Sequence, residues 1–214
     1  MTLIAFDFDG TLSDSEMTVS LGERAGVADE MRSITERAMA DEIDYAESLR
    51  ERAGLLAGLP DDEAAAAFDG VRLRPDAGAL LRRLDAAGHH VAILTGGFER
   101  GVARALAHAD ASEAVDTVVA NALPVADGAL TGEVTGPLIE GTKDDALAVL
   151  AAAVDEAVAT AVAVGDGAND LPMLAAAGLA VGYEPKAAVE PTCDETVASM
   201  TELATLFERE GLLD

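Results

Sequence analysis

Residues 3–11 read LIAFDFDGT, an apolar run that meets two aspartates and a glycine. Leu3 to Phe8 has the short apolar pattern of a strand that is buried on both faces, as strands of parallel sheets are. Two later runs, His90 to Leu94 and Ala161 to Val164, are of the same kind and end at the polar segments TGGF and GDGAND. The three runs therefore predict a parallel sheet.

Helical patterns lie between these strands, in the order expected of a doubly wound α/β fold. The predicted helices of this part are Ala77–Ala87, which stops at Gly88, Arg100–Ala107 and Asp144–Val154. Further strands are predicted at Val115–Ala120 and Leu179–Tyr183, and a small hairpin within Pro124–Val134 around the pair Asp127-Gly128. The sequence thus favours an α/β fold with a doubly wound, Rossmann-like parallel sheet.

Residues 14–76 differ from the rest, because they contain helical patterns and no strand-like run. Asp29–Ala40 and Tyr45–Ala57 are two of these patterns, and a break follows at Leu59-Pro60. We therefore expect two parts, a core made of residues 1–13 and 77–214 and a small helical insert, residues 14–76, directly after the first strand. The length of 214 residues suits such an arrangement.

The composition excludes several classes of protein. Fourteen Lys plus Arg stand against forty Asp plus Glu, which gives a net charge of −26. We expect no nucleic-acid partner, because phosphate backbones are bound by basic faces. The acids are spread along the whole chain and only two lysines are present, Lys143 and Lys186, which indicates a surface adapted to high salt.

The compartment is predicted from what the sequence lacks. The single cysteine, Cys193, cannot form an internal disulfide, and a reducing cytoplasm fits that composition. The N-terminal apolar run is shorter than a signal peptide requires, and no run of about 18 apolar residues occurs. We expect a cytoplasmic protein without a membrane segment.

Acidic residues follow two of the predicted strands. Asp7 and Asp9 are two residues apart and are expected to share one face of the first strand, where their charges would repel each other. Asp166 and Asp170 follow a second strand, and the carboxyl ends of parallel strands meet at one edge of the sheet. Carboxylates without a nearby His or Cys suit Mg²⁺, which would offset the repulsion.

An anion site is predicted beside these carboxylates. Thr95, Gly96 and Gly97 place a hydroxyl and backbone N–H groups at the expected start of a helix. Lys143 opens another helix and supplies a positive charge. A nucleophile, a metal, a cation and oriented donors are together what phosphoryl transfer requires.

These segments resemble the motifs of the haloacid dehalogenase superfamily of aspartate-nucleophile phosphatases. The resemblance rests on DFDGT (residues 7–11), LTGG (94–97), Lys143 and GDGANDLPML (165–174). Over nearly its whole length the chain is similar to the phosphoserine phosphatases of that superfamily, whose pattern it matches at Glu16 and in four further segments. Those segments are residues 25–52, TGGF (95–98), VANAL (119–123) and DGALTGEV (127–134).

The resemblance implies roles for the core residues. Asp7 would be the nucleophile that forms an aspartyl phosphate, and Asp9 the acid that protonates the leaving oxygen and then the base that activates water. Asp7, the backbone carbonyl of Asp9 and Asp166 would hold Mg²⁺, with Asp170 acting through its neighbours or through water. Asn169 would orient the phosphate or the water.

The resemblance also implies how a small-molecule substrate, O-phospho-L-serine, is bound. Thr95, Gly96 and Gly97 would donate to phosphate oxygens, and Lys143 would neutralise both the nucleophile and the phosphate. The helical insert would be a cap that sets specificity, in which Glu16 meets the substrate ammonium and Arg52 its carboxylate. Met39 and Tyr45 match cap positions that pack on the substrate.

Some features depart from the family pattern or leave alternatives open. Serine is more common where Gly10 and Thr95 stand, and the loop Gly182–Asp194 differs from the usual loop. The cap, not the core, selects the substrate, so phosphothreonine or a sugar phosphate is an alternative. A phosphomutase and a binding protein without turnover are further alternatives, and the chain is expected to be a monomer or a homodimer.

Overall fold

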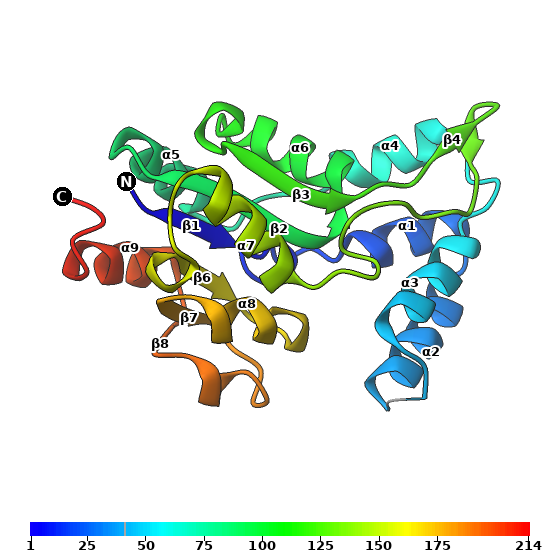
Figure 1. Ribbon diagram of the computed structural model, residues 1–214. Coiled ribbons are helices and arrows are strands. Elements are labelled where there is room, and N and C mark those ends of the chain that lie inside the picture. The colour runs from blue at the N-terminus through cyan, green and yellow to red at the C-terminus, as the bar shows by residue number, and fades with distance from the viewer. Residues whose placement is uncertain (41) are drawn as a thin grey trace.

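The structure is a computed structural model and describes residues 1–40 and 42–214. Its main sheet has six parallel strands in the order β3-β2-β1-β6-β7-β8 (Figure 1). The strands are β1 Leu3–Phe6, β2 His90–Phe98, β3 Thr117–Asn121, β6 Val162–Gly165, β7 Leu179–Tyr183 and β8 Glu195–Val197. The predicted doubly wound α/β fold is confirmed.

Helices cover both faces of this sheet. Leu3 and Ala5 of β1 pack in a cluster with residues of α7 (Lys143–Ala153) and α8 (Leu171–Ala176). Ile4 and Phe6, which alternate with them, face the opposite layer. That layer consists of α5 (Ala77–Ala86), α6 (Glu99–His108) and α9 (Met200–Arg209). All four residues of β1 are fully buried, because the strand lies at the centre of three layers.

Among the described residues, four helices lie between β1 and α5 in sequence. They are α1 Met17–Ala25, α2 Ala28–Met39, α3 Tyr45–Gly54 and α4 Asp61–Asp69. α1 packs on α2 and α4, α2 packs on α3, and α4 also contacts α6 of the sheet layers. Figure 1 shows α2 and α3 at one end of the molecule, beyond the end to which β1 points.

A hairpin of two short strands, β4 (Val125–Ala126) and β5 (Ala129–Leu130), contacts the turn between α3 and α4. Its turn residues Asp127 and Gly128 have φ of 50° and 79°, the backbone conformation that Asp-Gly pairs favour in such hairpins. Gly58 N donates to Leu130 O at 2.9 Å, and Asp61 N to Gly128 O at 2.9 Å. The predicted hairpin is confirmed, and it ties the chain after β3 to the helical insert.

The structure also differs from the sequence prediction at several elements. β8 and α9 were not predicted, and β1 ends at Phe6, two residues before the expected end. β2 extends to Phe98 and therefore includes Thr95 to Gly97. Within the two described ranges, no helix has the length and apolar character needed to cross a membrane.

Candidate active site

Asp7 and Asp9 do not share one face of a strand, which corrects the prediction made from their spacing. β1 ends at Phe6, and Asp7 is the first residue beyond it. The chain then turns tightly, and Gly10 N donates to Ser13 O at 2.8 Å. The turn rather than the pleat of a strand therefore sets the direction of the Asp9 side chain.

Gly10 is required where this turn passes the end of β6. Its φ is +91°, which side chains rarely allow. A Cβ atom at this position would lie 2.7 Å from the Asp166 carboxylate. The glycine therefore lets the turn after β1 approach the acid that follows β6.

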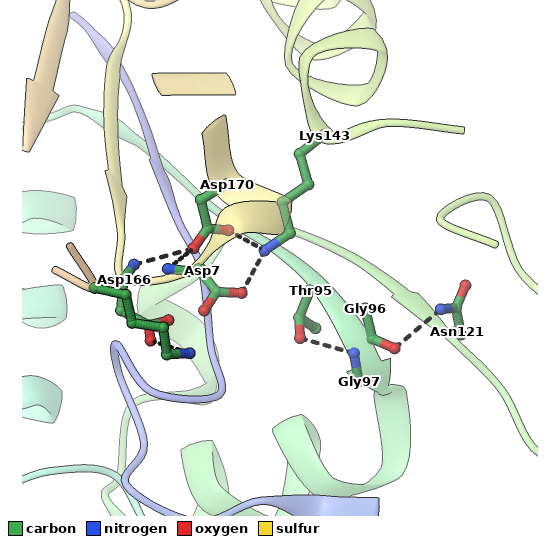
Figure 2. Close-up of polar contacts among 10 residues, drawn as sticks. Asp7, Thr95, Gly96, Gly97, Asn121, Lys143, Asp166 and Asp170 are labelled. Atoms are coloured by element: carbon green, nitrogen blue, oxygen red, sulfur yellow. Dashed lines mark hydrogen bonds and ion pairs between the residues drawn. The ribbon is translucent and has the colours of Figure 1, made fainter. Parts of the chain in front are cut away.

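Lys143 joins the two acidic segments. It is the first residue of α7, and its side chain is only 4% exposed. Its Nζ donates to Asp7 Oδ1 and lies 2.5 Å from Asp170 Oδ1, as Figure 2 shows. Both acids are also buried, so this is a charge network shielded from solvent.

Asp170 holds the turn after β6 with its other oxygen. Asp170 Oδ2 accepts hydrogen bonds from Asp166 N at 3.0 Å and Gly167 N at 2.9 Å (Figure 2). Both carboxylate oxygens of Asp170 are therefore already bonded to protein groups. The side chain fixes the position of Asp166 and of the Lys143 ammonium.

Burial and mutual repulsion raise the pKa values of the acids. Burial, then the charge of Asp170, raises the pKa of Asp7 to about 7, although Lys143 opposes the shift. Burial and the charges of Asp7 and Glu16 raise the pKa of Asp9 well above its ordinary value. Burial alone would lower the pKa of Lys143, yet the two neighbouring acids raise it. Negative charge in the site is thus incompletely balanced.

Residues Thr95 to Gly97 belong to the end of β2. The prediction that they lie at the start of a helix was wrong. The pairing of β2 with β3 is irregular between Leu94 and Phe98, and α6 begins only at Glu99. Gly97 N donates to Thr95 Oγ1 at 2.9 Å. The hydroxyl and this N–H are therefore oriented by each other and not by a helix terminus.

This end of β2 lies against Asp9. A Cβ at Gly97 would be 2.6 Å from Asp9 Oδ2, so only glycine permits this approach. On the other side, buried Asn121 donates from Nδ2 to Gly96 O at 3.0 Å (Figure 2). Asn121 thereby holds the strand end in place, a contact that was not predicted.

Glu16 and Arg52 approach the same region from the helical insert. Glu16 is exposed and directly precedes α1, and its charge acts on the pKa of Asp9. Arg52 lies on α3, and its Nε donates to Ser48 O at 3.3 Å. Burial lowers the pKa of Arg52, against the opposing effects of Tyr45 and Glu16. Glu16 therefore lies near Asp9, whereas Arg52 lies near Tyr45 and Glu16, and the two side chains form no ion pair with each other in the described structure.

A cavity of about 480 Å³ opens beside the network. Among its lining residues are Gly96, Lys143 and Asn169 from the core and Tyr45 from α3. The aromatic ring of Tyr45 comes close to Gly96, so the insert and the core meet here. The side chain of Met39 lies outside the described part of the structure.

Comparison with known proteins decides the family. Residues 4–175 match the model of the haloacid dehalogenase-like hydrolases. The chain is 57% identical over 212 residues to the phosphoserine phosphatase of Halobacterium salinarum, covering 99% of this chain and 100% of that protein. The chain belongs to the haloacid dehalogenase-like hydrolases. Within them it belongs to the phosphoserine phosphatase family.

Two solved structures extend this similarity to three dimensions. One is described as a phospho-aspartyl intermediate analogue of phosphoserine phosphatase, with a TM-score of 0.86, 32% identity and coverage of 96% of this chain and 98% of that chain. The other is a substrate-bound phosphoserine phosphatase complex, with a TM-score of 0.86, 31% identity and coverage of 96% and 97%.

The carboxylates of this hydrolase fit a divalent cation. Asp7, Asp166 and Asp170 each offer an oxygen within 4.8 Å of those of the other two, and all three are buried. With Asp9 they make a group of four carboxyl side chains, and we call these four residues the aspartate cluster. One oxygen of Asp9, Oδ1, is buried without a hydrogen-bond partner in the described structure. Oxygen donors alone, with neither His nor Cys, are the donors Mg²⁺ prefers.

A second lysine, which no sequence motif marks as part of the site, contacts the aspartate cluster. Lys186 Nζ lies 2.9 Å from Asp166 Oδ2. The two lysines bring two positive charges to four carboxyl groups, so the cluster would keep a net charge of −2 when all four are ionised, which a divalent cation would offset. The one sequence feature that could have indicated Lys186 is the rarity of lysine in this chain, since both lysines lie at this cluster.

Proposed function

We propose that this phosphatase hydrolyses O-phospho-L-serine to L-serine and phosphate, through an aspartyl phosphate on Asp7. The family membership and the similarity to a substrate-bound phosphoserine phosphatase support this substrate. The observation that carries the proposal is the ammonium of Lys143 between Asp7 and Asp170, at the wall of a cavity beside the helical insert.

The first half of the reaction forms the covalent intermediate. An oxygen of Asp7 attacks phosphorus, and the bond between phosphorus and the serine oxygen breaks. Asp9 in its acid form gives a proton to the leaving serine oxygen. The raised pKa of Asp9 supports this role, because a carboxyl with an ordinary pKa would hold almost no proton near neutral pH.

The second half reverses the role of Asp9. Its carboxylate accepts a proton from water, and the water oxygen attacks phosphorus. The bond between phosphorus and Asp7 breaks, so that phosphate leaves and Asp7 is restored. Gly97 supports this assignment, since it lets the Asp9 carboxylate lie directly against the end of β2.

Several groups bind the phosphoryl oxygens in this proposal. Lys143 neutralises both the nucleophile and the phosphate, and the Thr95 hydroxyl with the backbone of Gly96 and Gly97 supplies donors. Asn169, which lines the cavity, orients the phosphate or the attacking water. These donors come from the end of β2, from the turn after β6 and from the start of α7.

The helical insert, residues 14–76, acts as the cap that selects the serine group. Glu16 meets the substrate ammonium, and the guanidinium of Arg52 binds its carboxylate with two parallel hydrogen bonds. Arg52 has no ion-pair partner among the described residues, whereas Arg50 on the same helix pairs with Glu140. Exposed Arg104 also lacks an ion pair in the described structure, but Arg52 is half-buried, and a half-buried guanidinium without a charged partner supports binding of a ligand carboxylate.

Mg²⁺ is the cation that we propose for the aspartate cluster. Asp7, the backbone carbonyl of Asp9 and Asp166 would hold it, and Asp170 would support it by orienting the turn after β6. When bound, the ion neutralises charge on the phosphate and on Asp7. Lys143 and the donors at the end of β2 position the phosphoryl group.

The surroundings of the enzyme are also part of the proposal. We propose a cytoplasmic enzyme, monomeric or homodimeric, that works in strong salt. The net charge of −26 and the relative in Halobacterium salinarum support salt adaptation. Circular dichroism across a KCl series tests it, and a fold that is equally stable with almost no salt would contradict it.

Phosphate release tests the proposed activity. O-phospho-L-serine, O-phospho-L-threonine, a sugar phosphate and an aryl phosphate are compared in Mg²⁺ and strong KCl, with wild type and Asp7→Asn. We expect a marked preference for phosphoserine that disappears in the variant. Hydrolysis without that preference would point to another phosphomonoester, and no release from any of the four would contradict the phosphatase assignment.

A further inference from the structure

The two lysines of this chain contact the aspartate cluster in different ways. Lys143 is 4% exposed and bonds to two acids, so its ammonium is fixed inside the protein. The Lys186 side chain is 68% exposed and contacts one acid, Asp166. The cluster therefore has one permanent cation and one that can exchange its contact for solvent.

The backbone keeps Lys186 beside the cluster even when its side chain moves. Lys186 lies in the loop between β7 and β8, and its backbone N donates to Asp166 O at 2.9 Å. Its backbone O accepts a hydrogen bond from Val189 N at 2.8 Å. The loop is thus anchored next to Asp166, and only the flexible lysine stem needs to rotate to free the carboxylate.

We propose that Lys186 is a built-in competitor of the divalent cation: its ammonium occupies Asp166 in the metal-free enzyme and leaves that carboxylate when the cation binds. The inference rests on the proposed metal site and adds to it the control of metal affinity. Lys186 thereby stabilises the metal-free fold and weakens metal binding.

The chemistry of the contact supports an exchange. Both the ammonium and the cation require the Asp166 carboxylate, and like charges at one carboxylate repel. Lysine suits this role because it is a compact charge on a flexible stem, whereas the planar guanidinium of arginine tends to bind carboxylates with two hydrogen bonds. Twelve of the fourteen basic residues in this chain are arginines, yet a lysine stands here.

The proposal predicts that loss of the Lys186 charge strengthens Mg²⁺ binding and destabilises the metal-free protein. In Lys186→Met the affinity for Mg²⁺, measured by calorimetric titration, should rise about two- to fivefold, the range expected for an exposed ion pair. The melting temperature in EDTA should fall by about 1 to 4 °C, while in saturating Mg²⁺ it should stay close to that of wild type. Both readouts are independent of catalysis.

Two further variants separate the contact from a general charge effect. Lys186→Arg keeps the charge and can bind Asp166 with two hydrogen bonds, so it should bind Mg²⁺ no more tightly than wild type does. Arg104→Met removes one charge from exposed Arg104 on α6, a helix that contacts β2, β3 and α4, and should leave Mg²⁺ affinity within about 1.5-fold of wild type at 1 M KCl. The titrations are therefore made at that salt concentration.

The outcomes distinguish this inference from the proposed metal site. Unchanged or weaker Mg²⁺ binding by Lys186→Met would overturn the competitor role. An equal gain in Lys186→Met and Arg104→Met would also overturn it, because the effect would then be that of net charge. If wild type itself binds no Mg²⁺ in the titration, the metal site fails first, and the inference falls with it.

Discussion

Lys143 Nζ lies 2.5 Å from Asp170 Oδ1 and contacts Asp7 as well, so that one ammonium joins the end of β1 to the turn after β6. The two segments are more than 150 residues apart in sequence. The pairing of β1 with β6 brings the two segments together, and the Lys143 ammonium balances the two acids that this pairing places close to each other.

Replacing this charge should damage both fold and activity. Lys143→Met leaves two buried acids without their cation, and we expect a loss of about 3 to 5 kcal/mol in the free energy of unfolding of the metal-free protein. Urea unfolding in EDTA measures it, with Arg104→Met as the control. Mg²⁺ should restore part of the stability but not phosphatase activity, and an equal loss in the control would contradict the account.

Mg²⁺ affinity should increase with pH. The pKa of Asp7 is raised to about 7 in the metal-free protein, so the group is mostly protonated at pH 5.5 and mostly ionised at pH 8.5. Since the cation requires the carboxylate, binding at the lower pH must displace a proton. Calorimetric titrations at the two pH values check this, and equal affinities would contradict it.

The stability of the metal-free protein should change with pH in the opposite direction. A raised pKa in the folded state means that folding takes up a proton in the window from about pH 4 to pH 7. The contribution of Asp7 to the free energy of unfolding is therefore lost as the pH rises through about 7. In EDTA, Asp7→Asn should remove the part of this pH dependence that Asp7 causes, while the raised pKa of Asp9 contributes a further part. An unchanged slope in urea unfolding would show that other groups cause it.

Arg52 should matter for phosphoserine and not for a substrate without a carboxylate. Arg52→Ala should raise KM for O-phospho-L-serine about 30-fold or more, because a substrate carboxylate would lose its charged partner. Arg52→Ala should hydrolyse the aryl phosphate with nearly the kcat/KM of wild type. Arg50→Ala is a matched control, since Arg50 lies on the same helix and pairs with Glu140 on the surface. Equal losses on both substrates would refute the role of Arg52.

Gly97→Ala should impair catalysis by displacing Asp9. The added Cβ would lie 2.6 Å from Asp9 Oδ2, so the carboxylate must move. We expect kcat to fall about 10- to 100-fold, as displacements near 1 Å do in positioned sites. Gly54→Ala is the control, because apart from its chain neighbours and the backbone of its own helix no atom would lie within 4 Å of the added Cβ. A wild-type kcat in Gly97→Ala would show that the position of Asp9 is not critical.

The buried strands were predictable from the sequence because they are apolar on both faces. β7 was predicted with its observed bounds, whereas β8 was missed because Glu195 to Val197 is a short edge strand with one buried residue. The residues of the aspartate cluster were predictable as a set, since parallel strands end at one edge. Their directions were not, because the turn after Phe6 depends on hydrogen bonds that spacing does not reveal.

The contact of Lys186 was not predictable for a related reason. Its loop has no periodic pattern, and it meets Asp166 through a backbone hydrogen bond between residues 20 positions apart. Asn121 was equally hidden, since its partner is the backbone oxygen of Gly96 on a neighbouring strand. Contacts of this kind follow from the assembled sheet and not from any local pattern.

The exchange of labelled L-serine into O-phospho-L-serine tests the central claim, a covalent intermediate on Asp7, most directly. While the aspartyl phosphate exists, free serine can return to the site and accept the phosphoryl group, so label should enter phosphoserine during turnover. Asp7→Asn should show neither exchange nor hydrolysis. Full hydrolysis by wild type without any incorporation of label, at serine concentrations high enough to occupy the site, would contradict the account.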